Sequence, residues 1–247
     1  MKPTIIATLT LLASTFAHAG DWQPLFDGKT LEGWDGNPKF WTVKDGAITG
    51  TTTEANPTDG NTFIIFTGEN KDKTPVEFSD FELKFEYRIE GHNSGMQYRS
   101  FKLEGDNDGW RVGGYQADFD AKKQWAGTNY GEKFRGILAK RGEKAVITGT
   151  NSVQTKRGVR VTATTEVEPI GDPGKLAEKI KDAPAWNEMH IIAKGNDLQQ
   201  KINGVLMSHI IDNDKENARD SGLIALQLHG GPPMVVQIRN VQNKELD

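Results

Sequence analysis

The 247-residue chain contains no cysteine. This absence excludes disulfide bonds, a lipid-modified N-terminal cysteine and any metal site built on thiolates. A chain without these cross-links depends on its hydrophobic core. The 228 residues that follow a predicted leader (247 − 19) are enough to bury one.

Long hydrophobic runs are missing except at the N-terminus. Lys2 precedes an apolar run at residues 5–16, and Ala-His-Ala follows at 17–19. This run is too short to span a bilayer, and the order of charge, apolar run and small residues is typical of a secretory signal peptide. We therefore predict a cleaved leader at 1–19, a periplasmic or secreted protein, and no membrane span.

The chain also lacks a net positive charge. Loss of the leader removes only Lys2 among the charged residues, which leaves a net charge of 29 − 34 = −5. No basic run stands out, so a nucleic-acid partner is not expected. Neither a fixed-period repeat nor a low-complexity linker interrupts residues 20–247, which we interpret as one domain.

Familiar catalytic motifs are absent from the sequence. It contains no Gly-x-Ser-x-Gly, His-Glu-x-x-His, phosphate-binding loop or dinucleotide fingerprint. Asp-Asn-Asp-Gly at 106–109 resembles the start of a calcium loop but lacks the closing glutamate, which favours a plain turn. No metal-ligand cluster is evident, so no metal site and no certain cofactor are predicted.

What the sequence does contain is β-strand periodicity. Phe81, Leu83, Phe85, Tyr87 and Ile89 alternate with charged residues, as in a half-buried strand. Many short apolar segments of this kind follow one another between glycine and asparagine turns. This pattern predicts an all-β jelly-roll sandwich of two antiparallel sheets.

Local signals refine this prediction. Asp-Gly at 45–46 and Asn-Gly at 203–204 predict hairpin turns. Asp172 as N-cap, followed by proline, predicts one short helix near 173–181. Residues 151–156 are predicted to form a loop at the rim.

Polar side chains gather in residues 93–120. Strand alternation places Gln97 and Arg99 on one face of a first strand, and Gln116, Asp118 and Asp120 on one face of a second. Amides, a guanidinium and carboxylates on one face have the composition of a sugar site. An ordinary solvated sheet face is the alternative.

Two kinds of titratable group are candidates for catalysis. Asp118 and Asp120 lie two residues apart on one face, and such carboxylates compete for ionisation, which can raise the pKa of one of them. Two solvated aspartates are the alternative. His229 ends a strand beside two glycines and shares a face with Gln227, so its ring could reach a ligand and titrate near neutrality. A histidine that caps a turn is the alternative. Glu104, in the excursion between the two strands, is a further candidate.

Several segments resemble the 3-keto-disaccharide hydrolase family. The resemblance covers nearly all of residues 21–241 and rests on the order and spacing of the following segments: 25–34, 41–46, 93–95 with Arg99, 114–118, 186–188, 202–204, 226–230 and 238–240. It implies a concanavalin A-like jelly roll and activity on glycosides oxidised at carbon 3. Many members carry a glutamate in the strand that here reads Gly114-Tyr115-Gln116, so its role is not transferable.

The implied reaction explains the residue types. A ketone at carbon 3 acidifies the proton on carbon 2, and the enolate left by its removal expels the group on carbon 1; hydration then completes net hydrolysis. This requires a base, a cation or donor at the enolate oxygen, and an acid. Asp118 or His229 is predicted as the base and Arg99 as the cation, which a divalent metal could replace.

The other polar residues of this region are predicted to bind the substrate; they are Gln97, Gln116, Asp120, Glu104 and Asn93. The partner expected is a 3-keto-sugar or another carbohydrate. A non-catalytic carbohydrate-binding module on the same sandwich is the main alternative, and an ordinary endoglycosidase is a weaker one. The sequence leaves the sugar, the linkage and the oligomeric state open.

Overall fold

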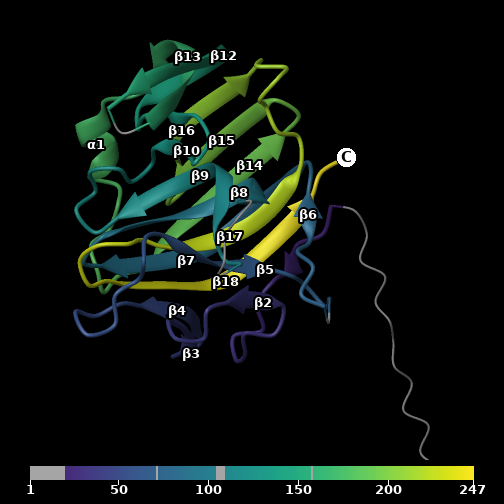
Figure 1. Ribbon diagram of the computed structural model, residues 1–247, viewed down its shortest axis with the longest axis vertical. Helices are drawn as coiled ribbons and strands as arrows, with labels where there is room; N and C mark the ends of the chain where they lie inside the picture. The colour runs from purple at the N-terminus through teal and green to yellow at the C-terminus, as the bar shows by residue number, and fades with distance from the viewer. Residues whose placement is uncertain (1–19, 71, 104–108, 157) are drawn as a thin grey trace, which may run out of the picture.

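Two β-sheets packed face to face form the protein (Figure 1), which is the predicted all-β jelly-roll sandwich. The computed structural model describes residues 20–70, 72–103, 109–156 and 158–247. The predicted leader at 1–19, Glu104 and residues 106–108 of the predicted turn lie outside these ranges.

The larger sheet contains ten strands within the described residues. All of its neighbouring pairs are antiparallel except β12 and β16, which is the one departure from two purely antiparallel sheets. In spatial order its strands are β13 (Gly158–Pro169), β12 (Glu143–Thr155), β16 (Val205–Asp212), β15 (Asp197–Ile202), β14 (Asn187–Lys194), β7 (Phe81–Glu90), β18 (Val235–Glu245), β4 (Ala47–Thr51) and β3 (Trp41–Lys44), with β1 (Gln23–Pro24) beside β18.

The smaller sheet contains eight strands within the same ranges, and it carries most of the residues 93–120 discussed above. In spatial order they are β11 (Gly136–Ala139), β10 (Asn129–Glu132), β9 (Val112–Asp120), β8 (Asn93–Lys102), β17 (Gly222–Leu228), β5 (Thr62–Phe66) and β2 (Trp34–Gly36), with β6 (Glu77–Phe78) beside β17.

The predicted helix is present as α1 (Pro173–Ala177), with Asp172 as its N-cap accepting a hydrogen bond from the Lys175 amide at 2.8 Å. It is shorter than predicted because the amides of Lys179 and Ile180 bond three residues back rather than four. No helix among the described residues is long and apolar enough to cross a membrane.

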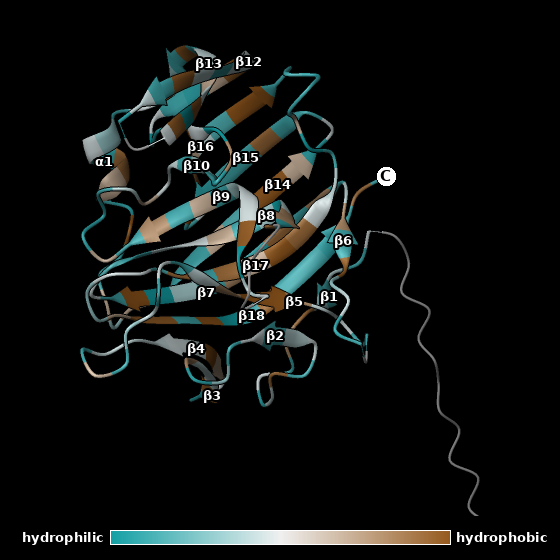
Figure 2. Cartoon of the chain, viewed as in Figure 1, coloured by the Kyte–Doolittle hydropathy of each residue, from teal (hydrophilic) through white to brown (hydrophobic). Residues whose placement is uncertain are grey.

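The core lies between the sheets and follows the alternation of β7. Phe81, Leu83, Phe85 and Tyr87 are at most 1% exposed, whereas their polar neighbours are half-buried or exposed. Figure 2 shows hydrophobic and hydrophilic residues interspersed along the strands. The ring of Tyr87 stacks on Phe119 of β9 at 4.2 Å between centroids, which joins the two sheets. Burial of each such side chain contributes about 1.5–3 kcal/mol.

The strand β9 therefore has one face in the core and one facing away from it. The side chains of Tyr115, Ala117 and Phe119 pack into the core, so Gln116 and Asp118 lie on the outer face of the smaller sheet. All nine residues of β9 are nonetheless buried, because other segments cover this outer face. Such a covered polar face can form a site.

Two predicted hairpin turns were confirmed, and the rim loop predicted at 151–156 was wrong. Asp45 and Asn203 have positive φ angles of 52°, and the glycines after them complete the turns. Residues 151–155, predicted as a rim loop, instead belong to β12 and pair with β13 from Asn151–Thr162 to Thr155–Gly158. Cross-strand pairing extends this hairpin although its residues are exposed.

Candidate active site

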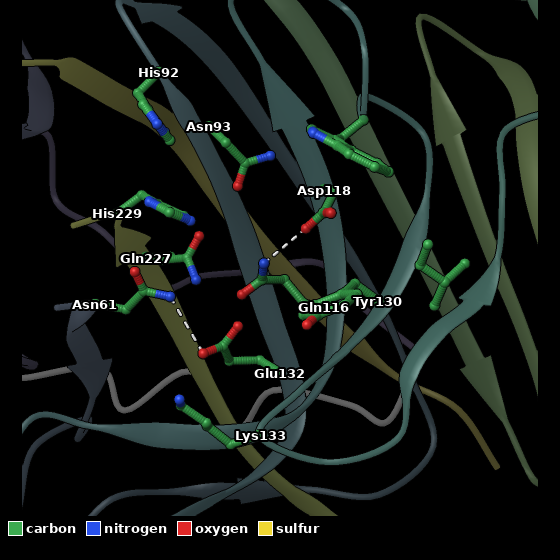
Figure 3. Close-up of a pocket in the computed structure, with 12 residues that line it drawn as sticks. Asn61, His92, Asn93, Gln116, Asp118, Tyr130, Glu132, Lys133, Gln227 and His229 are labelled. Carbon is green, nitrogen blue, oxygen red and sulfur yellow. Dashed lines mark hydrogen bonds between the residues drawn. The ribbon is translucent and has the colours of Figure 1, made fainter. Parts of the chain in front are cut away.

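A cavity of about 450 Å³ lies on the outer face of the smaller sheet (Figure 3). Four of the residues predicted from the sequence line it, namely Asn93, Gln116, Asp118 and His229. The other lining residues are Asn61, His92, Trp125, Tyr130, Glu132, Lys133, Ile137 and Gln227. Their side chains are chiefly amides, carboxylates and rings, so the predicted polar face does form a concave site.

A chain of hydrogen bonds orients Asp118. The Ser100 hydroxyl donates to Gln97 Oε1 at 2.5 Å, Gln97 Nε2 to Gln116 Oε1 at 2.7 Å, and Gln116 Nε2 to Asp118 Oδ1 at 2.7 Å. Gln97 is fully buried and does not line the cavity, so it supports Gln116 rather than touching a ligand. Gly95 leaves room for Gln116, because a Cβ there would lie 2.5 Å from its side chain.

Asp118 is a buried carboxylate, 5% exposed, with no cation beside it in the described part of the chain. Burial raises its pKa well above the usual range. The Gln116 hydrogen bond opposes this rise, and the negative charges of Glu132 and Asp120 add to it. Its Oδ2 has no hydrogen-bond partner among the described residues. Such a carboxylate is suited to accept a proton from a ligand.

Glu132 supplies a second carboxylate that sequence reasoning missed. It is 7% exposed, and burial raises its pKa despite the hydrogen bond from Asn61 Nδ2 to its Oε1 at 3.2 Å and the charges of Lys133 and His229. It pairs with Gly114 in register, which places it on the same face as Asp118. β10 has only four residues, too few to show periodicity, so a shared face of Tyr130 and Glu132 was the only available signal.

Two stacked imidazoles border the cavity. The rings of His92 and His229 are 4.5 Å apart, and Figure 3 shows His229 beside Gln227. Nδ1 of His229 lies 2.6 Å from the carbonyl oxygen of Gly230, which can only accept, so Nδ1 carries the proton. In neutral His229 the Nε2 lone pair is therefore the basic one. Burial and the charge of His229 lower the pKa of His92, although Asp120 opposes this.

Gln227 lies between His229 and Gln116 with its amide directed into the cavity (Figure 3). It is 1% exposed, and neither its oxygen nor its nitrogen has a hydrogen-bond partner among the described residues. An unsatisfied buried amide costs about 1–3 kcal/mol. A ligand that offers both a donor and an acceptor would remove this cost. The strand face that Gln227 shares with His229 was the signal for it.

Asp120 does not line the cavity, contrary to the prediction. Its carboxylate accepts hydrogen bonds from the backbone amides of Lys122, Gln124, Trp125 and Ala126, at 2.5–3.1 Å. A chain turn directly after β9 brings these amides to it, which strand alternation cannot reveal. Asp120 thereby holds the loop that carries the exposed indole of Trp125 at the cavity.

Arg99 is also placed wrongly by the alternation. A β-bulge between Tyr98 and Phe101 sets Arg99 in a left-handed conformation, φ 43°, and turns it away from the face of Asp118. Its guanidinium donates to Asp80 Oδ1 at 2.7 Å and to the carbonyl oxygens of three other residues, Ser79, Gly195 and Arg219. Arg99 therefore connects loops, and Lys133 is the cationic side chain that lines the cavity within the described part of the chain.

The bulge also explains why residue 114 is a glycine. Arg99 and Ser100 both face Gly114, and a Cβ at Gly114 would lie 2.6 Å from the Ser100 hydroxyl oxygen. No side chain fits there, and Glu132 reaches the same face from the neighbouring strand.

In the described ranges no group of three or more His, Asp or Glu is arranged to hold a metal ion, so a divalent metal that replaces the cation remains a prediction.

Comparison with known protein families gives a match over residues 21–244 to the 3-keto-alpha-glucoside-1,2-lyase-like domain. The chain belongs to this family. This match confirms the resemblance predicted from the sequence, and it spans nearly all the described residues. Among curated proteins, none matches the sequence significantly. Membership of this family indicates that the protein acts on or binds carbohydrate.

Solved structures with the same fold are distant in sequence. The carbohydrate binding module CBM66 from Bacillus subtilis superimposes with a TM-score of 0.50 at 16% identity, covering 86% of this chain and 96% of its own. A putative glycosyl hydrolase from Parabacteroides distasonis also gives 0.50, at 18% identity, with coverage of 92% and 100%. At these identities the likeness shows the fold of the lyase-like chain alone.

Proposed function

We propose that the protein cleaves 3-keto-glucosides by proton abstraction at carbon 2, elimination at carbon 1 and hydration. The observation that carries this proposal is Asp118, a buried carboxylate with a raised pKa and a free oxygen inside a polar cavity. The family name supports an α-linked 3-keto-glucoside as the substrate. A solvated sheet face would not contain such a group.

In the elimination step Asp118 takes the proton from carbon 2. The electron pair of the broken C–H bond then forms the enolate with the ketone at carbon 3. The Gln227 amide, which has no partner of its own, donates to the ketone oxygen as negative charge develops there. The enolate then expels the carbon 1 substituent as the C1–O bond breaks. Glu132, which lines the same cavity, is the acid: in its protonated form it gives its proton to the departing oxygen.

Hydration returns Asp118 and Glu132 to their starting protonation states. A water molecule adds to carbon 1 and returns one proton to Glu132, while Asp118 returns its proton to carbon 2, so the net reaction is hydrolysis. Glu132 pairs with Gly114, which lies four residues before Asp118 on β9. The backbones of Glu132 and Asp118 are therefore about 13 Å apart along the strand direction. Figure 3 shows Gln116 between the two carboxylates, and all three residues line the cavity in which we place the sugar ring.

The indole of Trp125 supports the sugar from the side. It is 40% exposed although it lines the cavity, and Asp120 fixes its backbone. A flat aromatic ring of this kind packs against the apolar face of a pyranose. His229 is the second candidate for the base, because its Nε2 lone pair is free when the ring is neutral.

The test compares a methyl 3-keto-α-glucoside with its unoxidised parent, with divalent metal supplied. We expect release of methanol from the keto-glucoside alone, and exchange of its carbon 2 proton into deuterated water. Cleavage of the unoxidised parent would instead indicate an ordinary glycosidase. Binding of the keto-glucoside without exchange or release would overturn the enzyme proposal.

A non-catalytic carbohydrate-binding module is the second candidate. The exposed Trp125 and the fold shared with the Bacillus subtilis binding module favour it. Both functions need a ring to contact the sugar, but only the enzyme needs a base. The proton-exchange experiment therefore separates them.

We also propose that the protein acts outside the cytoplasm. The support is the signal-peptide pattern at residues 1–19, in which a lysine, an apolar run and Ala-His-Ala follow one another. N-terminal sequencing of the exported protein should begin near Gly20 or Asp21. An intact Met1 in the cytoplasmic fraction would contradict this.

A further inference from the structure

A second cavity of about 420 Å³ adjoins the first. The two share Tyr130, Lys133 and Ile137, so one continuous groove runs from the candidate active site. The second cavity lies between the segment 131–137 and the edge strand β13, which a hydrogen bond of 3.0 Å from the Ala163 amide to the Arg135 carbonyl holds in place. Figure 1 shows the β12–β13 hairpin at the end of the molecule near β10.

Exposed apolar side chains are concentrated along this groove. Five large hydrophobic residues are exposed within the described chain, and three of them, Trp125, Ile137 and Val159, line one or both cavities. Val153 and Val167 are the other two, and both lie on the hairpin outside the groove. Solvent-exposed apolar surface next to a polar site is typical of a surface that a ligand covers.

The charges on the second cavity have one sign. Among the described residues Lys133 and Arg160 line it, and no carboxylate does. Arg160 has no ion-pair partner in the described ranges. Its charge acts on the Tyr130 phenol, where it opposes the rise in pKa caused by burial and by the nearby carboxylates, so the guanidinium lies near that ring. An apolar floor with unpaired cations is complementary to an aromatic anion.

We propose that the second cavity binds the leaving group of the substrate, and that it selects an aromatic leaving group with a negative charge. This rests on the proposed function, which places the sugar in the first cavity. The bond that breaks would then lie where Tyr130 and Lys133 line both cavities. The volume of the second cavity is sufficient for a benzene ring with a carboxylate.

The first experiment measures binding of the released group alone. Isothermal titration should show 4-hydroxybenzoate binding more tightly than 4-hydroxybenzamide, its neutral counterpart. Arg160→Gln should weaken 4-hydroxybenzoate about three- to fivefold, as expected for an exposed ion pair, and leave the amide unaffected. Val159→Asp should weaken it about tenfold, because it adds a negative charge and removes apolar contact.

Two matched variants serve as controls. Val167→Asp introduces the same charge on the same strand, and Lys156→Gln removes a cation from the same hairpin, but neither residue lines the groove. Both should bind 4-hydroxybenzoate as the parent does. Equal losses in Val159→Asp and Val167→Asp would overturn the proposal, since they would show a general charge effect. So would equal affinity of Arg160→Gln and the parent.

The second experiment separates this proposal from the proposed function. The kcat/KM ratio of 4-carboxyphenyl to 4-carbamoylphenyl 3-keto-glucoside should fall about three- to fivefold in Arg160→Gln. Turnover of the methyl keto-glucoside with an unchanged ratio would overturn the leaving-group site and leave the enzyme proposal intact. No turnover of any keto-glucoside, with binding of 4-hydroxybenzoate still sensitive to Arg160, would overturn the reaction and support the aromatic-anion site.

Discussion

Asp118 and Asp214 are equally buried, at 5% exposure, yet their surroundings act on them in opposite ways. Asp118 receives one side-chain hydrogen bond from a neutral amide, and burial raises its pKa. Burial also acts to raise the pKa of Asp214, but hydrogen bonds from Thr150, Asn217 and the Glu216 amide, with the charge of Arg135, lower it overall.

The region around Asp214 is a closed network. Arg135 donates to both oxygens of Asp212, lies 3.4 Å from Asp214 and also donates to the Tyr115 hydroxyl. Both carboxylates there, those of Asp212 and Asp214, have a cation or several hydrogen-bond donors. Asp118 lacks such partners, and a carboxylate of this kind can bind and release a proton during a reaction. The contrast separates structural from functional buried charge.

The largest expected effect is on catalysis. Asp118→Asn keeps the shape of the side chain but removes its charge and basicity, so turnover of the 3-keto-glucoside should fall by about 10²–10⁴-fold. Proton exchange at carbon 2 should fall with it. Asp214→Asn, at a site of equal burial, is the matched control and should retain turnover while it stays folded.

His229→Gln is the parallel variant. If Asp118 is the base, His229→Gln keeps measurable exchange of the carbon 2 proton. Loss of exchange in His229→Gln alone would transfer the role of base to the histidine. Exchange that survives in both variants would require another base, with Glu132 next.

A large effect on stability is expected in the other region. Arg135→Met would leave the charge of Asp212 buried and without its cation, which should lower the free energy of unfolding by about 3–5 kcal/mol. Urea denaturation measures this. Arg135→Lys keeps the charge but not the two-pronged geometry, and should lose less. A loss below about 1 kcal/mol in Arg135→Met would show that the network is not structural.

A smaller effect is expected at Gln227. Gln227→Leu removes an amide that is unsatisfied in the free protein, so it should raise the free energy of unfolding by about 1 kcal/mol. It should also raise KM for the keto-glucoside about tenfold and lower kcat, because both the ketone oxygen and the developing enolate lose a hydrogen-bond donor. Asn243→Leu, a buried amide away from the cavity, is the control for binding. A Gln227→Leu variant that binds substrate normally would contradict this role.

The smallest effect is a difference in pH dependence. The raised pKa of Asp118 means that the folded state holds its proton more tightly than the unfolded state, so its contribution to stability is full at acid pH and lost as pH rises through the folded pKa. The lowered pKa of Asp214 contributes stability above the ordinary carboxyl pKa, and this is lost as pH falls through the folded value.

The two asparagine variants should therefore diverge. Relative to the parent, Asp118→Asn should gain stability as pH rises from acid to neutral, and Asp214→Asn should lose it. Urea denaturation across this pH range measures both slopes. If the free energy of unfolding of both variants, relative to the parent, changed with pH in the same direction, the contrast between the two aspartates would be wrong.

Much of the fold could be predicted from the sequence because periodicity is a local property. The alternation of Phe81 to Ile89 predicted β7 and its core face, and Asn203-Gly204 predicted a hairpin turn. The loop predicted at 151–156 failed because long strands can extend past the core when they pair with one another. The parallel contact of β12 with β16 joins segments far apart in sequence, and no local pattern indicates it.

Within the site, the sequence by itself determined that Gln116 and Asp118 share a face, since successive side chains of any strand alternate. It also predicted Asn93 and His229 as site residues, but the pairing of β8 with β9 and β17 brings them to this face. Only the tertiary structure decided that a bulge turns Arg99 away, that Asp120 holds a loop, and that Glu132 and Gln227 complete the cavity. The physical reason is that bulges, loop returns and strand neighbours depend on contacts between distant segments, whereas alternation depends on the backbone alone.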